Sequence, residues 1–289
     1  FIMDKMLRGL GLSGKSVVPL LSGAACAIPA IMSTRNIENW KDRLITIMVT
    51  PLMSCSARLP VYTLLISMAI PSDQYYGFVS LQALVMLAMY VLGTVAALVA
   101  AVVFKWIIRH DIPSYFIMEL PIYHVPRWRN IWLNMWQKSL SFVKEAGKVI
   151  LIVSVVLWFL ASYGPRADIE PAIEPIGFNW KIGISLITSF AAREVFVGTM
   201  STIYSVGDEE NFEQLRAKMN KDKLPNGEPV YTLAVVLSLM VFYAFAMQCM
   251  STLAVVYKET KSWKWPAIQF VYMTALAYLG SWLVFNLFH

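Results

Sequence analysis

The sequence predicts an all-α, polytopic transmembrane domain built from two inverted gate repeats, each a re-entrant hairpin followed by a broken helix. Hydrophobic residues make up 58% of the chain and charged residues only 15%. Three stretches without Asp, Glu, Lys or Arg, 76–104, 230–257 and 266–288, each exceed the roughly 20 residues that span a bilayer. Three further apolar stretches are interrupted by proline, glycine or charge, which is typical of transporter segments that break near the membrane midplane.

The interrupted stretches are the parts of the chain where function is expected. They are 16–34, with Pro19, Gly23 and Pro29, 44–71, with Pro51, Arg58 and Pro60, and 182–206, with Arg193 and Glu194 at its centre. Proline frees backbone carbonyls that lipid cannot satisfy, and an unpaired charge in hydrocarbon is costly. Each stretch is therefore expected to face protein or a water-filled path.

An internal repeat relates these stretches. Ser22-Gly-Ala-Ala25 in the first hairpin resembles Ser189-Phe-Ala-Ala192 in the second, and Met53-Ser-Cys55 resembles Met247-Gln-Cys249 in the later broken segment. The order is the same in both halves, and the charged insert 207–229 accounts for the difference in spacing. The matched residues are small and apolar, so chance similarity is the alternative.

The chain is divided into four units by these predictions. We expect a first gate repeat over 1–71, two transmembrane helices joined by a basic cytoplasmic loop over 72–163, a second gate repeat over 164–257, and a C-terminal transmembrane helix over 258–289. The fourth span, 142–163, is long enough only if its lysines reach the membrane surface. An odd number of spans then separates the two hairpins, which makes the repeats inverted.

The net charge of +6 is explained by membrane topology, and nucleic acid is not expected as a partner. Loop 105–148 holds seven Lys or Arg residues against three acids, whereas 164–181 is neutral to acidic. Positively charged loops stay in the cytoplasm, so 105–148 is placed there. If 182–206 crosses the membrane once instead of forming a hairpin, the insert 207–229 and the C-terminus change sides, and the sequence leaves this alternative open.

The three cysteines are candidate metal ligands. Cys26, Cys55 and Cys249 each lie beside small residues or proline in an interrupted segment, and none lies in an exported loop that would favour a disulfide. A thiolate suits a soft or borderline metal such as Fe(II), Zn or Cu(I). The alternative is that they are small apolar packing residues, which is common for free cysteine.

The buried charges have two interpretations. Glu194 is a candidate hard ligand or proton acceptor, because it is the carboxylate at the centre of a predicted hairpin. Arg58 and Arg193 are assigned to gating and charge pairing, and an ion pair between Glu194 and Arg58 is the structural alternative. His124, in a proline-bounded part of the cytoplasmic loop, is assigned to coupling and not to a metal site.

The motif Gly9-Leu-Gly-Leu-Ser-Gly-Lys-Ser16 matches the GxxxxGK[ST] phosphate-loop pattern. A phosphate loop follows a buried strand and precedes a helix in a soluble βαβ unit, and neither flank has that character. We interpret the motif as a turn leading into the first hairpin. The sequence has no Ser/His/Asp triad, CxxC pair or HExxH, so no enzyme activity and no bound cofactor are expected of this chain.

Several motifs together closely resemble the membrane domain of FeoB-type ferrous iron transporters. They include Gly23-Ala-Ala-Cys26-Ala-Ile-Pro29, Met53-Ser-Cys-Ser-Ala-Arg-Leu-Pro60, Glu119-Leu-Pro-Ile-Tyr-His-Val-Pro126 and Ala192-Arg-Glu-Val-Phe-Val-Gly198. The resemblance covers nearly the whole chain. Two departures are Gln248, where many relatives have proline, and Arg193, where many have lysine.

The resemblance implies a permease domain of a GTPase-linked importer, with Fe(II) as the transported substrate and Cys26, Cys55 and Cys249 as proposed contacts. It implies a multi-pass protein of the bacterial inner membrane. The family's GTPase domain, which would bind GTP and Mg, is absent here, so we expect this chain to be a fragment. Expected partners are membrane lipids, that GTPase domain, a small cytoplasmic accessory protein and further copies of the chain. A nucleoside-type or other solute permease is the alternative function.

Overall fold

The computed structural model describes residues 12–70, 75–76, 79–108, 173–190, 193–204, 212–223, 229–247 and 249–288, with short pieces between 127 and 155. His124 and most of the predicted span 142–163 lie outside the described residues. The predicted all-α polytopic class is confirmed: the elements are helices, apart from the two-residue strands β1 (Tyr75–Tyr76) and β2 (Val79–Ser80).

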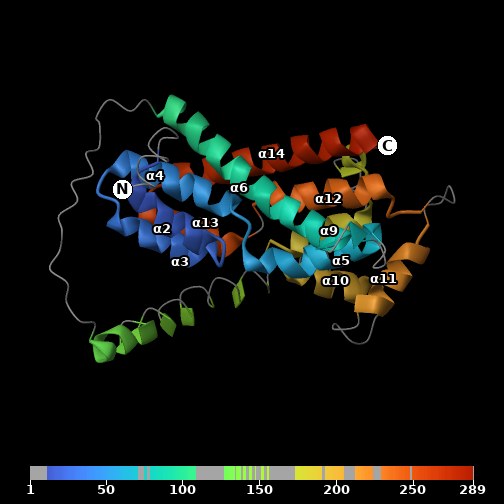
Figure 1. Ribbon diagram of the computed structural model, residues 1–289, viewed down its shortest axis with the longest axis horizontal. Helices are drawn as coiled ribbons and strands as arrows, with labels where there is room; N and C mark the ends of the chain where they lie inside the picture. Colours follow the sequence, from blue (N-terminus) through green and yellow to red (C-terminus); the bar gives the residue numbers. More distant parts are fainter. Residues whose placement is uncertain are drawn as a thin grey trace.

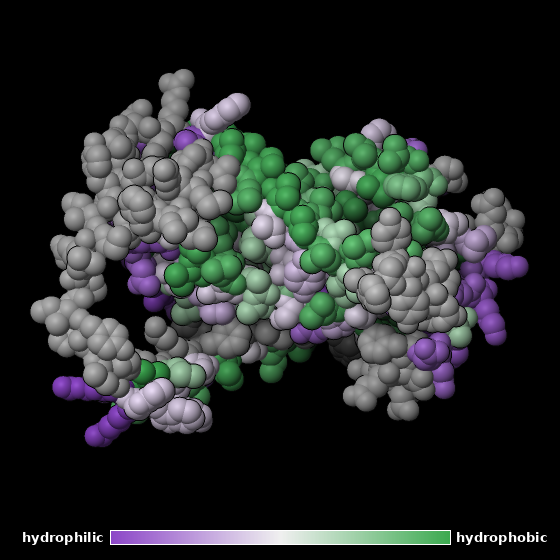
Figure 2. All heavy atoms as spheres, in the orientation of Figure 1, coloured by the Kyte–Doolittle hydropathy of each residue, from purple (hydrophilic) through white to green (hydrophobic). Residues whose placement is uncertain are grey.

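Among the described residues, four segments are long and apolar enough to cross a membrane. They are Trp40–Ala69, Leu81–Ile107, Leu233–Thr260 and Lys264–Phe288. The first and third are interrupted, whereas the second and fourth are continuous helices. Figure 2 shows the matching surface, with apolar side chains over the middle of the molecule and strongly hydrophilic residues toward its two ends.

The first hairpin consists of two short helices. The 3-10 turn η1 (Gly14–Ser16) leads into α2 (Val17–Gly23), and after two turn residues and Cys26 the chain returns as α3 (Ala27–Ser33), followed by η2 (Thr34–Asn36). Gly23 allows close packing on the next segment, because a Cβ there would lie 3.2 Å from Thr50 Cγ2. The prediction of a hairpin over 16–34 is confirmed.

The first broken helix runs over Trp40–Ala69. Helix α4 (Trp40–Val49) is capped by the Asn39 side chain, and it gives way to η3 (Thr50–Leu52) at Pro51. The chain resumes with η4 (Ser56–Arg58) and α5 (Leu59–Ala69), which has a proline in its first turn. Proline cannot donate the next helical hydrogen bond, which explains why the helix ends here.

Helix α6 (Leu81–Ile107) crosses beside the first broken helix. Its inner face is made of small residues that include Gly93, Ala97 and Ala101, and its outer face carries exposed leucines and valines. A Cβ at Gly93 would lie only 2.5 Å from Ser54 Oγ. This glycine therefore lets the break of the first helix lie against α6.

The second repeat has the same plan. After η5 (Glu174–Ile176), helices α9 (Trp180–Thr188) and α10 (Val195–Ile203) form a hairpin. The amphipathic helix α11 (Phe212–Lys221) follows and buries Leu215 and Met219. The second broken helix is α12 (Leu233–Phe245) and α13 (Met250–Thr260), and α14 (Lys264–Phe288) packs along α12.

The two hairpins enter from opposite ends of the molecule, as Figure 1 shows. The open end of the first hairpin lies beside the start of α4, where Ser16 Oγ is 2.9 Å from Thr46 Oγ1. The open end of the second lies at the far end of α5, where α11 packs and Lys181 pairs with Asp222. Because Lys181, at the start of α9, and Tyr204, after the end of α10, both bind Asp222, the described part of the second hairpin begins and ends on the same side of the molecule.

Candidate functional site

Four residues singled out from the sequence each directly precede a helical segment, the three cysteines with extended backbone and Glu194 with helical backbone. Cys26 is the N-cap of α3, Cys55 of η4, Glu194 of α10 and Cys249 of α13. Each is therefore the residue at which the chain resumes a helix after the interruption of a hairpin or a broken helix. The positive end of a helix dipole lies at that point, and it favours an anionic group such as a thiolate or carboxylate.

The fold brings these residues together although up to 223 positions separate them. Cys26 lies within electrostatic range of Cys55, Cys249 and Glu194. The three thiols are free and half-buried, and Glu194 is exposed. Among the residues that the structure describes, no three His, Cys, Asp or Glu side chains lie close enough to hold one metal ion.

Each hairpin tip contacts the break of its own repeat. In the first repeat, Ser56 Oγ donates to the Ala25 carbonyl at 3.0 Å. In the second, the Met250 amide donates to the Phe190 carbonyl at 3.1 Å. Residues next to Cys55 and Cys249 are thus joined to residues of the hairpin tips, which is how the fold gathers the four N-cap positions.

Two buried arginines bind the carbonyls that the helix breaks set free. Arg58, with 0% exposure, donates to the carbonyls of Pro51 and Leu52, both at 3.3 Å, and to Ser54 Oγ at 3.1 Å. A buried carbonyl without a donor is costly, and a guanidinium supplies several donors in a fixed geometry.

Arg193 has the same role in the second repeat. It is 5% exposed and donates to the carbonyls of Tyr243 and Ala246, each at 2.9 Å. In the described residues these arginines bind backbone carbonyls, and Arg58 also binds the Ser54 hydroxyl, so these contacts do not form the Arg58–Glu194 ion pair that the sequence left as an alternative. The guanidinium of Arg58 also lies within electrostatic range of Arg193 and of the Cys55 thiol.

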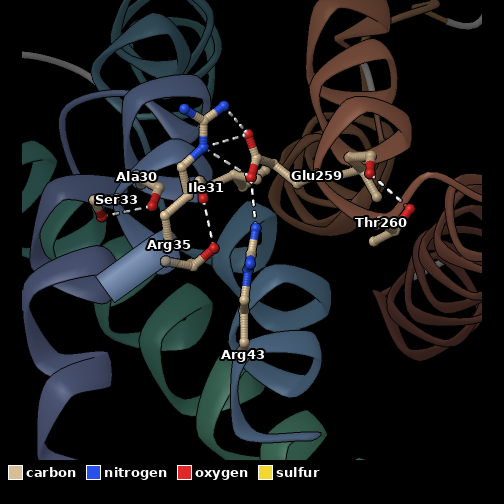
Figure 3. A network of polar contacts seen from close by, with 9 residues as sticks. Ala30, Ile31, Ser33, Arg35, Arg43, Glu259 and Thr260 are labelled. Carbon is tan, nitrogen blue, oxygen red and sulfur yellow. Dashed lines mark hydrogen bonds and ion pairs between the residues drawn. The ribbon is translucent and has the colours of Figure 1, made fainter. Parts of the chain in front are cut away.

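A buried carboxylate that the sequence interpretation missed joins the two repeats at the opposite end of α13. Figure 3 shows Glu259 between two arginines of the first repeat. Arg35 donates to it through Nε at 2.9 Å and Nη2 at 2.5 Å, and Arg43 through Nη2 at 2.6 Å. The Glu259 side chain is 3% exposed. The only signal in the sequence was an acidic residue just beyond an apolar span.

The residues of the phosphate-loop pattern that the structure describes are engaged in protein contacts. Lys15 pairs with Glu38 at 2.7 Å, and Ser16 is fully buried against Thr46. Residues 1–11 lie outside the described part of the chain. These contacts agree with the interpretation of Gly14–Ser16 as the turn into the first hairpin. His124 also lies outside the described residues, so its coupling role stays a prediction.

Comparison with known families identifies the membrane domain. The Gate family model, described as nucleoside recognition, matches residues 1–69 and 143–263, and the model of the ferrous iron transport protein B C terminus matches 86–138. The chain is 48% identical over 314 residues to an Fe(2+) transporter FeoB of Leptospira interrogans, with 99% of the chain covered. The chain belongs to the Gate family as an FeoB-type membrane domain.

Further relatives support this assignment of the FeoB-type chain. An Fe(2+) transporter FeoB of Leptospira biflexa is 47% identical, with 99% of the chain covered. A fusion of Fe(2+) transport protein A with an Fe(2+) transporter FeoB, from Porphyromonas gingivalis, is 33% identical, also over 99% of the chain. The chain spans 45% of the length of the Leptospira relatives and 39% of the fusion protein. No solved structure matches it at a significant level.

The family and the four apolar segments together show that the FeoB-type chain is a multi-pass bacterial membrane protein. The sequence indicates Cys26, Cys55, Cys249 and Glu194 as candidate ligands, and the fold places all four at helix N-caps. That shared position could not be read from the residue pattern, because it depends on where each helix resumes.

Proposed function

We propose that this chain is the permease domain of a ferrous iron importer and that Fe(II) passes between Cys26, Cys55, Cys249 and Glu194. The observation that carries the proposal is that all four are N-cap residues of interrupted helices. Cys55, Cys249 and Glu194 also lie within electrostatic range of Cys26. Transporters use such helix interruptions to build ion and substrate sites at the midplane. Thiolates favour Fe(II) over hard cations such as Mg²⁺.

The geometry suggests how transport would proceed. In the described residues, no three of the candidate ligands are close enough to bind one ion together. Capture by three ligands would therefore require the hairpin tips and the helix breaks to move toward each other. We infer that such closure and reopening is the gating step. Metal binding to thiols releases protons, because the thiolate is the ligand.

The proposal also includes a GTPase domain elsewhere in the whole protein and a small accessory partner. Since the chain spans 45% of its Leptospira relatives, we propose that a GTPase domain, using GTP and Mg, supplies the driving force from elsewhere in the protein. The Porphyromonas gingivalis fusion joins the homologous region to Fe(2+) transport protein A. We propose a protein of that kind as the small accessory partner, with lipids and further copies of the chain as the other partners.

The test is anaerobic uptake of radioactive Fe(II) by cells that express the whole protein. The triple variant Cys26→Ser, Cys55→Ser, Cys249→Ser is expected to lose uptake at matched expression, because serine keeps the volume but not the soft ligand. Residues that act as one site lose function non-additively, so Cys55→Ser with Cys249→Ser is expected to be little worse than the poorer single variant. Wild-type uptake in the triple variant would refute the proposal.

The carboxylate is tested in the same assay. Glu194→Gln keeps the shape and removes the charge, so uptake is expected to fall while expression is maintained. Glu174→Gln is the matched control, because Glu174 is also exposed but lies in η5, outside the hairpin and its break. Equal uptake in the two variants would remove Glu194 from the site. A solute permease, the alternative, predicts nucleoside uptake that the cysteine replacements leave unchanged.

A further inference from the structure

The C-terminal helix α14 belongs to neither repeat, yet it places two polar side chains on the first broken helix. Gln269 has 0% exposure, and its Nε2 lies 3.2 Å from the carbonyl oxygens of both Ile47 and Met48. The Tyr272 hydroxyl donates to the Met48 carbonyl at 2.5 Å. Both accepting carbonyls are in the last turn of α4, immediately before the break that leads to Cys55.

The position of these donors is explained by Pro51. In an α-helix the carbonyl of residue i accepts from the amide of residue i+4, so Ile47 would be served by residue 51. Proline has no amide hydrogen, and the Ile47 carbonyl is left without its helical donor. Gln269 supplies that missing donor from another helix. Tyr272 occupies the neighbouring carbonyl and packs edge-on against Phe104 of α6, with ring centroids 5.3 Å apart.

The amide of Gln269 carries a cost to stability, because one of its two polar atoms is buried without a partner among the described residues. Among the residues that the structure describes, its Oε1 is buried without a hydrogen-bond partner. Rotating the amide would point this oxygen at two carbonyl oxygens, so the donor orientation is the favourable one. An apolar side chain would avoid the buried, unpartnered oxygen. The amide is therefore explained by its two acceptors and not by packing.

The same helix is anchored to the second repeat. Ser281 Oγ lies 2.5 Å from Ser238 Oγ of α12 and also donates to the Ser238 carbonyl at 3.0 Å. Gly280 permits close contact, because a Cβ there would lie 3.1 Å from Val241 Cγ1. Through these contacts α14 is held against α12 while Gln269 and Tyr272 hold the end of α4.

We propose that Gln269 and Tyr272 are positioning residues that set the place of the Cys55 break relative to α12. Gln269 donates to the Ile47 carbonyl, which Pro51 leaves without its helical donor, and both residues donate to the adjacent Met48 carbonyl. The inference rests on the proposed function only in treating Cys55 as a site residue. Loss of either donor is expected to let the break move and to expose the Cys55 thiol, whether or not the cargo is iron.

The test measures the reaction rate of a single thiol with a water-soluble maleimide, in the chain purified in detergent and without metal. One set of variants keeps Cys55 alone and the other keeps Cys249 alone. Gln269→Leu and Tyr272→Phe are expected to raise the Cys55 rate by about fivefold, the effect of losing roughly one hydrogen bond. The Cys249 rate is expected to change little.

The matched control is Gln82→Leu. Gln82 Nε2 also donates to a backbone carbonyl, that of Ile70 at 2.8 Å, but at the opposite end of α5 from Cys55. General destabilisation of the fold would raise both thiol rates in all variants. A selective rise at Cys55 in the two α14 variants, absent in Gln82→Leu, supports the positioning role, whereas a parallel rise at Cys249 overturns it.

Rescue by a second substitution separates positioning from packing. Pro51→Ala returns an amide hydrogen that can serve the Ile47 carbonyl from within the helix. In the Pro51→Ala background, Gln269→Leu is therefore expected to leave the Cys55 rate unchanged. If Gln269→Leu raises that rate equally in both backgrounds, or in neither, the proposal is wrong. Because the assay contains no iron, failure of iron transport and failure of this inference are told apart.

Discussion

Arg193 Nη2 donates a 2.9 Å hydrogen bond to the Ala246 carbonyl, although 53 positions separate the two residues. The bond joins the tip of the second hairpin to the break of the second broken helix. In the first repeat the carbonyls freed at the break are bound by a residue close in sequence, since Arg58 binds carbonyls only six and seven positions before it. Both breaks are thus closed by a buried guanidinium, but only in the second does it tie a hairpin to a break.

Arg193→Met is expected to lower the free energy of unfolding by about 2–4 kcal/mol, because two buried carbonyls lose a charged donor. Arg193→Lys keeps a charged donor, and its free energy of unfolding is expected to lie between those of Arg193→Met and the wild type. Thermal unfolding in detergent, followed by the fluorescence of the ten tryptophans, gives the measurement. Arg216→Met on α11, a half-buried arginine outside the hairpin and the broken helix of the second repeat, is the control. Equal losses in Arg193→Met and Arg216→Met would contradict the capping role.

Arg43→Met is expected to destabilise the protein more than Arg35→Met, although both arginines bind Glu259. The Arg43 side chain is 21% exposed and that of Arg35 is 52% exposed, so water screens the second pair more strongly. We expect a loss of about 2 kcal/mol for Arg43→Met and less than about 1 kcal/mol for Arg35→Met. The two variants make the same substitution, and the more exposed Arg35 donates to Glu259 through two nitrogens whereas Arg43 donates through Nη2, so the comparison sets exposure against the hydrogen bonds that are lost. A larger effect for Arg35→Met would show that exposure does not rank these pairs.

Asp222→Asn is expected to destabilise the end of the molecule that holds α11, in a pH-dependent way. Burial opposes ionisation of Asp222, but hydrogen bonds from Lys181 and Tyr204 outweigh it and hold the carboxyl pKa below its ordinary value of 3.8. A lowered pKa in the folded state gives a stabilising contribution that is complete above the ordinary pKa and disappears as the pH falls through the folded one.

The measurement is the unfolding temperature of wild type and Asp222→Asn between neutral and acid pH. The difference between them is expected to be constant at neutral pH and to close below about pH 4. Glu213→Gln, an exposed acid on α11, serves as control and is expected to match the wild type throughout. A difference that widens on acidification would mean that the Asp222 pKa is raised in the folded protein.

The transmembrane class and the places where helices break followed from local features of the sequence. Charge-free runs indicated α6 and α14, and Pro51 marked the break in the first broken helix. The apolarity of a span and the missing amide of a proline are both properties of the local sequence. The three cysteines and Glu194 were singled out by the same local contrast between polar groups and an apolar setting. Whether they bind iron stays a prediction.

The partners of the freed backbone groups were decided only by tertiary structure. Nothing in the periodicity of the chain indicates that Gln269 serves the Ile47 carbonyl, or that Glu259 binds Arg35 and Arg43. Such pairs depend on the distance and rotation of helices that are more than 200 positions apart in the chain. A hydrogen bond is lost when its donor–acceptor distance changes by a fraction of an ångström or its angle by a few tens of degrees. The sequence therefore determined where donors and acceptors would be needed, and the packing of α14, α13 and the second hairpin decided which residues provide them.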